Sequence, residues 1–170
     1  MNPIKILALK NFPIIEPYDD LASIIDKSIY LNNIKIDDSD VFIVAQKIIS
    51  KSENRYVDLD TIEVSEEAES LASKLNKNKG LVQAIINESK KIISTEKNIL
   101  IVEHKLGFIN INAGIDQSNI SQDKNTALLL PENPTKSAID LHQKLSSRLN
   151  KDISIIISLI YKESFEYNIT

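Results

Sequence analysis

Short apolar runs and amphipathic segments follow one another along this chain, and polar turns separate them. Apolar residues at helical spacing predict helices over Leu21–Ile29, Ala68–Leu75, Val82–Ile93 and Ala138–Leu149. Compact apolar runs predict strands over Ile4–Leu9, Val41–Val44, Ile99–Glu103, Phe108–Ile111, Ala127–Leu130 and Ile153–Ile157. This order predicts an α+β fold, a mixed sheet with flanking helices, although a mixed α/β arrangement is also compatible with it. We expect a single domain over residues 1–170, because no linker or repeat interrupts the pattern.

Capping residues indicate where several of these helices begin. Asp19 and Asp20 precede the first helix, and Ser65 precedes the second. The pair Asn133–Pro134 is typical of an N-cap followed by proline at the first helical position. Gly80 interrupts the chain between the second and third predicted helices.

Two of the predicted strands show no alternation of apolar and polar residues. Val41–Val44 and Ile153–Ile157 are almost entirely apolar, and we expect both to be buried on their two faces. Ile153–Ile157 is equally compatible with an exposed edge strand, which would recruit another chain.

Composition limits the classes of partner. The formal net charge is −4 and only two arginines are present, which argues against nucleic acid or an anionic membrane surface as partner. Cysteine is absent, so disulfides, thiolate nucleophiles and zinc-thiolate sites are excluded within this sequence. The sequence begins without a secretory signal pattern and lacks an apolar run long enough to span a bilayer, so we expect a cytoplasmic protein.

The most distinctive candidate site is the segment Asn112–Asn119, which follows a predicted strand. Gly114 permits a positive φ there, Asp116 is a hard oxygen donor suited to Mg²⁺ or Mn²⁺, and Asn119 offers both a donor and an acceptor. From spacing alone, the favoured interpretation is that both side chains bond only to the backbone of their own turn. His104 and His142 lack a partner at metal-ligand spacing, and the scattered glycines form no phosphate-binding loop.

Several segments, in order, resemble the gamma-glutamyl ligases that extend the deazaflavin coenzyme F420. They are Phe12–Ile15 with Asp19–Leu21, then Asp40–Lys51, Glu88–Ser89, Asn112–Asn119 and Leu128–Pro134. The resemblance extends over nearly the whole chain to about Ser158, so it is far more specific than any one motif. It implies the N-terminal part of such a ligase.

The resemblance implies a GTP-dependent reaction that joins L-glutamate, in gamma linkage, to the deazaflavin precursor. A substrate carboxylate is activated as an acyl phosphate, the amine of glutamate attacks it, and GDP and phosphate are released. Mg²⁺ or Mn²⁺ neutralises the phosphate charge. By match to the family's motifs, Asp116 is the expected metal ligand. The expected GTP-binding residues are Lys10, Asn11, Phe12, Pro13, Ala45, Gln46, Ser50 and Asn119. Ser50 could equally be an ordinary residue of the loop after Val44.

The sequence departs from the family after Ile153–Ile157. The family places an Asp-Thr pair on the metal there, whereas this chain has Leu159 and Ile160, which cannot coordinate a hard cation. We therefore expect a C-terminally truncated ligase domain with doubtful activity alone, and a homodimer. Two alternatives remain: a related gamma-glutamyl ligase acting on a folate-like acid, and a non-catalytic dimeric remnant.

Overall fold

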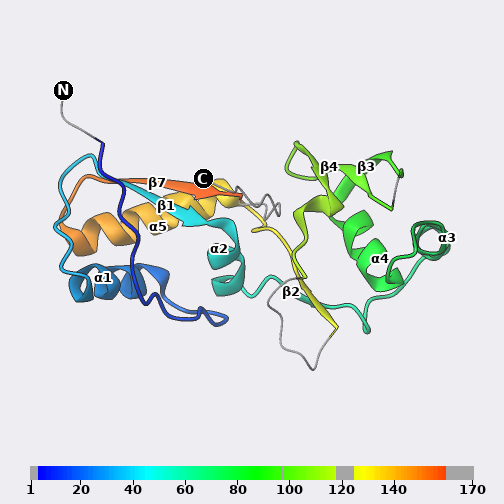
Figure 1. Ribbon diagram of the computed structural model, residues 1–170, viewed down its shortest axis with the longest axis horizontal. Helices are drawn as coiled ribbons and strands as arrows, with labels where there is room; N and C mark the ends of the chain where they lie inside the picture. Colours follow the sequence, from blue (N-terminus) through cyan, green and yellow to red (C-terminus); the bar gives the residue numbers. More distant parts are fainter. Residues whose placement is uncertain (1–3, 97, 118–124, 160–170) are drawn as a thin grey trace, which may run out of the picture. The chain divides into compact units, whose positions relative to one another are not determined.

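The computed structural model describes residues 4–96, 98–117 and 125–159 of the chain. Helices and small sheets follow one another as expected of an α+β protein, which confirms the predicted class (Figure 1). The described strands form three small sheets, one parallel and two antiparallel. None of the helices in the described ranges is both long enough and apolar enough to cross a membrane.

The chain divides into two compact units. The first combines the residues up to Ser52 with those from Pro134 onward, and the second runs from Glu53 to Asn133. A single domain over residues 1–170 stays a prediction.

The first unit packs its helices around an aliphatic core. Its elements are α1 (Leu21–Leu31), β1 (Val41–Ala45), α2 (Gln46–Ser52), α5 (Pro134–Leu149) and β7 (Ser154–Ser158). As predicted, Asp20 caps α1: its carboxylate accepts a hydrogen bond from the Ser23 N–H at 3.4 Å. Pro134 is the first residue of α5, also as predicted. Ile15 and Leu145 are fully buried between these elements and lie in one apolar cluster.

Strands β1 and β7 pair in parallel, with Ile43 beside Ile156. Asp38 ties the strands together at their start: its carboxylate accepts the Asp152 N–H at 2.9 Å and lies 3.2 Å from the Lys151 Nζ. These contacts, the backbone hydrogen bond first, lower the pKa of Asp38.

The prediction that β1 and β7 are buried on both faces is wrong. Val44 is buried, whereas Ile43 is 68% exposed and Ile156 is 50% exposed. Phe42 and Ile155 point the other way and pack against the apolar cluster that holds α1 and α5. Apolar composition predicted the strands correctly, but it could not show that only one face of this sheet is covered.

Two further expectations about this unit are wrong. Ile4–Leu9 forms no strand; Ile4 and Ile6 are 92% and 89% exposed, and no strand in the described ranges pairs with them. A β-strand requires a ladder partner, which apolar composition does not supply. The segment after Val44 is not a loop, because α2 begins directly after β1 at Gln46.

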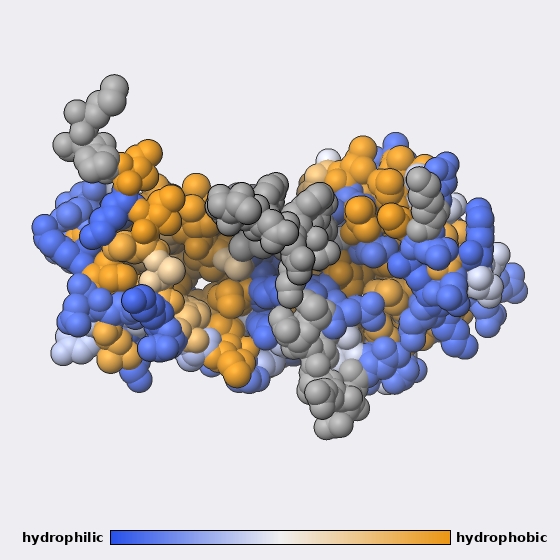
Figure 2. All heavy atoms as spheres, in the orientation of Figure 1, coloured by the Kyte–Doolittle hydropathy of each residue, from blue (hydrophilic) through white to orange (hydrophobic). Residues whose placement is uncertain are grey.

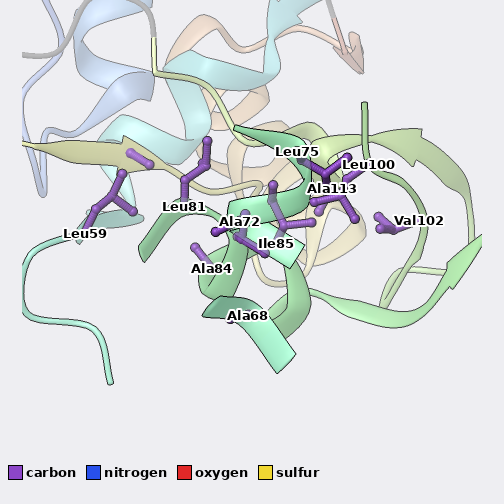
Figure 3. Close-up of a cluster of buried hydrophobic side chains, with 12 residues drawn as sticks. Leu59, Ala68, Ala72, Leu75, Leu81, Ala84, Ile85, Leu100, Val102 and Ala113 are labelled. Carbon is purple, nitrogen blue, oxygen red and sulfur yellow. The ribbon is translucent and has the colours of Figure 1, made fainter. Parts of the chain in front are cut away.

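The second unit combines a helix pair with two small sheets. Its helices are α3 (Glu66–Leu75), α4 (Lys79–Asn87) and the short η1 (Asn112–Gly114). Its strands are β2 (Tyr56–Asp58), β3 (Ser89–Ser94), β4 (Ile101–His104), β5 (Ile109–Ile111) and β6 (Thr126–Leu128). Strand β4 lies between β3 and β5, and β2 pairs with β6. Figure 3 shows how Leu59, Leu81, Ile85, Leu100 and Val102 gather in the core of this unit.

Two predicted boundaries in this unit are wrong. Gly80 does not break the chain but lies in the first turn of α4, where the ideal Cβ position would be 2.1 Å from the Leu59 carbonyl oxygen. Ile92 and Ile93 were expected in a helix and instead belong to β3. Helix α4 ends before them at Asn87, and β3 pairs with β4, so tertiary pairing overrides the helical spacing of these residues.

Candidate functional site

A left-handed turn lies two residues before the candidate metal ligand Asp116, and the extended residue Ile115 separates them. Asn112, Ala113 and Gly114 all have positive φ, at 49°, 53° and 68°. Left-handed backbone costs roughly 1–2 kcal/mol for a residue with a Cβ, and it occurs mostly at single positions. Ala113 adopts it while fully buried in the core. Backbone strain of this kind occurs at functional sites, but several other residues of this chain also have a positive φ, so the metal-binding role of Asp116 stays a prediction.

The backbone of Asp116 is fixed against β6. Its N–H donates to the Leu128 carbonyl at 3.0 Å, and its carbonyl accepts the Leu128 N–H at 2.8 Å. Gly114 allows the turn to pack closely against Leu130, because a Cβ at this position would lie only 3.0 Å from the Leu130 side chain. Asp116 is itself partly buried. The turn and the strand therefore hold this residue at a defined place.

Arg55 connects the segment after β6 to the end of α4. Its Nε donates to the Leu130 carbonyl at 2.9 Å, and its own carbonyl accepts the Leu129 N–H at 2.9 Å. The Arg55 guanidinium also forms an ion pair with Glu88, with 3.3 Å between Nη2 and Oε2. Both side chains are largely shielded from solvent. The pair thus ties the segment after β6 to the end of α4. The sequence singled out Glu88 only within a segment that resembles the family, and it gave no signal for the ion pair with Arg55.

His104 is the most deeply buried titratable group near this pair. Its Nδ1 accepts the Leu106 N–H at 2.9 Å, which places the proton of the neutral ring on Nε2. Nε2 lies 3.8 Å from the Glu88 carboxylate and makes no hydrogen bond within the described part of the chain. The ring stacks on Phe108, with centroids 5.1 Å apart. Burial lowers the pKa of His104, and the neighbouring Glu88 charge opposes this shift without reversing it.

The first predicted GTP-binding segment, Lys10 to Pro13, forms a turn against the end of α1. The Lys10 N–H donates to the Asn32 side-chain oxygen at 2.9 Å, and the Asn32 side-chain amide donates back to the Lys10 carbonyl at 3.2 Å. Asn11 has a positive φ of 54°, Phe12 is half-buried and Pro13 is exposed. The turn is held in place while part of its surface remains open to a ligand.

The second predicted GTP-binding segment lies where β1 passes into α2. Ala45 ends the strand, Gln46 begins the helix, and the Gln46 amide donates to the Ser50 hydroxyl. Ser50 is fully buried, so its side chain stabilises the first turn of α2 from within. Its role in nucleotide binding stays a prediction.

The described residues do not form a divalent-cation site by themselves, and the metal-binding role of Asp116 stays a prediction. Within residues 4–96, 98–117 and 125–159, no three His, Cys, Asp or Glu side chains gather closely enough to hold a metal ion. Leu159 is 39% exposed, and its side chain offers no oxygen ligand. Asn119 lies outside the described residues. Asp116 belongs to the second unit and the segments around Lys10 and Gln46 to the first, so one shared nucleotide site stays a prediction.

A hollow of about 320 Å³ that the sequence did not predict lies in the second unit. It is lined by Leu59, Asp60, Ile62, Val64, Asn78, Lys79 and Gly80. The Asp60 carboxylate accepts a hydrogen bond from the Asn125 amide at 3.0 Å, and Asn78 caps α4. None of the residues predicted to bind GTP or metal lines it. The close approach of Gly80 to Leu59 shapes this hollow, and sequence patterns do not show such an approach.

Comparison with known proteins identifies the family. Residues 10–167 match the family model described as F420-0:Gamma-glutamyl ligase. The coenzyme F420:L-glutamate ligase of Methanocaldococcus jannaschii is 38% identical over 123 residues, which cover 72% of this chain and 48% of the relative. The ligase of the same name from Methanothermobacter thermautotrophicus is 32% identical over 155 residues, covering 91% of this chain and 61% of the relative.

The Methanosarcina barkeri relative, also named coenzyme F420:L-glutamate ligase, is 35% identical over 152 residues, covering 89% of this chain and 56% of the relative. The chain thus spans between 48% and 61% of the length of these three curated relatives. The match nevertheless takes in both compact units and both segments that the sequence singled out, around Lys10–Ser50 and around Asp116. The chain belongs to the F420-0:gamma-glutamyl ligase family.

Proposed function

We propose that this chain forms part of a GTP-dependent ligase that adds L-glutamate in gamma linkage to the deazaflavin precursor of coenzyme F420. The observation that carries the proposal is the family match over residues 10–167, which includes the strained turn before Asp116. A cytoplasmic location and Mg²⁺ or Mn²⁺ as the cation belong to the same proposal.

The described residues do not by themselves fit a resident divalent cation. Asp116 brings one carboxylate, and hard cations such as Mg²⁺ require about six oxygen ligands, several of which water and phosphate supply. In the resemblance found from the sequence, Leu159 takes the place of an oxygen ligand, although the match to the family model continues to residue 167. Asp116 therefore contributes one ligand of a shared site, and the remaining protein ligands come from polypeptide outside the described residues.

This ligand deficit leads to a specific expectation for the chain alone. We expect weak, metal-dependent GTP binding at most, and no joining of glutamate to the precursor. Because a single carboxylate holds a cation weakly, the substitution Asp116→Ala changes the affinity for GTP by no more than about threefold.

Calorimetric titration of GTP, with and without Mn²⁺, tests this expectation on the wild-type chain and on Asp116→Ala. Asp60→Ala is the matched control, since Asp60 is an acid of the same unit that lines the separate hollow. A large loss of GTP affinity in Asp116→Ala alone would mean that the chain holds a more complete site. Measurable joining of glutamate to the precursor by the chain alone would contradict the expectation for this chain.

A homodimer is the second part of the proposal. Strand β7 has one partner, β1, among the described strands, so its other edge is open to another chain. We expect light scattering to report the mass of a dimer at micromolar concentration, with dissociation on dilution. A monodisperse monomer across the dilution series would rule the dimer out.

A further inference from the structure

The residues that end and follow β6 are held between Asp116 and Arg55. On one side, Leu128 exchanges two backbone hydrogen bonds with Asp116, at 3.0 and 2.8 Å. On the other side, the Arg55 carbonyl accepts the Leu129 N–H and the Arg55 Nε donates to the Leu130 carbonyl, both at 2.9 Å. The backbone of Asp116 is therefore bonded to a segment that Arg55 holds in place.

The side chain of Leu130 forms a second link between Arg55 and the turn before Asp116. A Cβ at Gly114 would lie 3.0 Å from the Leu130 Cδ1, so the turn packs closely against this side chain. Leu130 is buried, and close-packed interiors transmit small displacements. A shift of Leu130 would therefore reach Asp116 through the turn as well as through Leu128.

Glu88 fixes the direction of the Arg55 guanidinium, with 3.3 Å between Nη2 and Oε2. Hydrophilic residues gather at the surface over α3, at the right of Figure 2, whereas these two side chains are only 24% and 17% exposed. Exchanging a shielded ion pair for apolar residues is often neutral or stabilising, so net stability does not explain the pair. A guanidinium supplies direction instead, because its planar fork donates to two acceptors at fixed angles.

We propose that Arg55 and Glu88 are positioning residues for Asp116. Glu88 holds the Arg55 guanidinium, and Arg55 holds the segment to which Asp116 is bonded, so the pair sets the place at which the Asp116 carboxylate meets a cation. The role of the cation rests on the proposed function, whereas the positioning of Asp116 does not.

Amide hydrogen exchange, followed residue by residue with NMR, tests the positioning on the full chain. Arg55→Lys keeps the positive charge, but a lysine ammonium is a single point and cannot hold both acceptors in the geometry of the fork. We expect exchange of the Asp116 N–H to rise at least about tenfold more than that of the Val82 N–H. The Val82 N–H is the reference, because it donates to the Asn78 carbonyl at 3.1 Å within the same unit.

Two control variants separate positioning from an ordinary loss of stability. Ile85→Val trims a fully buried side chain in the core of the same unit, so exchange should rise equally at both reporter amides. Arg148→Lys makes the same replacement at the other arginine, which pairs with Asp20 at 2.8 Å in the first unit, and should leave both amides unchanged.

Glu88→Gln is the second test variant, and it decides the question should Arg55→Lys fail to fold. Glutamine keeps an oxygen that accepts from Arg55 but lacks the charge that strengthens the bond. We expect exchange at Asp116 to rise at least about threefold more than at Val82 in this variant.

Mn²⁺ and GTP together provide the readout that connects positioning to chemistry. Paramagnetic Mn²⁺ broadens the NMR signals of nearby atoms, so it should broaden the Asp116 amide signal of the wild-type chain. We expect this broadening to be lost in Arg55→Lys at the same concentrations and kept in Ile85→Val. Absence of broadening in the wild-type chain would overturn the cation role of Asp116, while the exchange measurements still decide the positioning.

Three results would overturn the positioning proposal. The first is an equal rise of exchange at Asp116 and Val82 in Arg55→Lys, since the pair would then contribute only to stability. The second is unchanged exchange at Asp116 in both Arg55→Lys and Glu88→Gln. The third is equal broadening of the Asp116 signal in the wild-type chain and in Arg55→Lys, which would disconnect the pair from the cation.

Discussion

Replacing Gly114 with alanine tests whether the turn before Asp116 is held by packing. Gly114 has a φ of +68°, and its ideal Cβ position lies 3.0 Å from the Leu130 Cδ1 and 3.2 Å from the Asn110 Nδ2. Alanine at a left-handed position costs roughly 1–2 kcal/mol. Crowding against a buried neighbour adds about 1–3 kcal/mol, and Leu130 is only 2% exposed.

Gly107→Ala provides the comparison that separates these two costs. Gly107 also has a positive φ, +93°, but its ideal Cβ position meets only the Lys90 Nζ, at 3.9 Å. It therefore carries the backbone cost without the crowding. We expect Gly114→Ala to lower the free energy of unfolding by about 1–3 kcal/mol more than Gly107→Ala does.

Equilibrium urea denaturation, followed by far-ultraviolet circular dichroism, measures both losses. The chain contains no tryptophan, so circular dichroism is preferred to fluorescence. Equal losses in the two variants would refute the claim that Leu130 and Asn110 clamp the turn. A smaller loss in Gly114→Ala than in Gly107→Ala would refute it more strongly, since the crowded position would then be the more tolerant one.

Two further predictions concern the second unit. Gly80→Ala should lower the free energy of unfolding by about 1–3 kcal/mol, because the alanine Cβ would lie 2.1 Å from the Leu59 carbonyl oxygen. This loss outweighs the roughly 1 kcal/mol by which alanine ordinarily favours a helix over glycine. A raised melting temperature would contradict the prediction. Burial lowers the pKa of His104 in the folded chain below its ordinary 6.5, so the unfolded chain binds the proton more readily. The free energy of unfolding therefore falls as the pH drops from 6.5 through the lowered pKa of the folded state. His104→Phe should flatten this fall in urea titrations between pH 7.5 and 5.5, and an unchanged pH dependence would contradict the assignment.

Local signals in the sequence determined three of the described helices, α1, α3 and α5. Asp20 and Ser65 cap α1 and α3 through bonds to the N–H groups of residues three positions later, so the interaction is contained in the sequence itself. The apolar spacing of α5 likewise depends on neighbours one turn away, and Leu145 lies in the core as its position predicts. Gly114 takes the positive φ that its place in the segment indicated.

Only the tertiary structure decided which strands pair and which faces are covered. Ile4–Leu9 is nearly as apolar as β1, but it finds no ladder partner among the described strands. Strand β1 pairs with β7, more than a hundred residues further along the chain. The resemblance to the family identified Asp116, but the hydrogen bonds that fix its backbone come from Leu128. Arg55 bonds to the Leu130 carbonyl just after that strand, and an ion pair with Glu88 holds the Arg55 guanidinium. These partners are distant in sequence, and side-chain spacing along a chain carries no record of contacts that form only when remote segments meet.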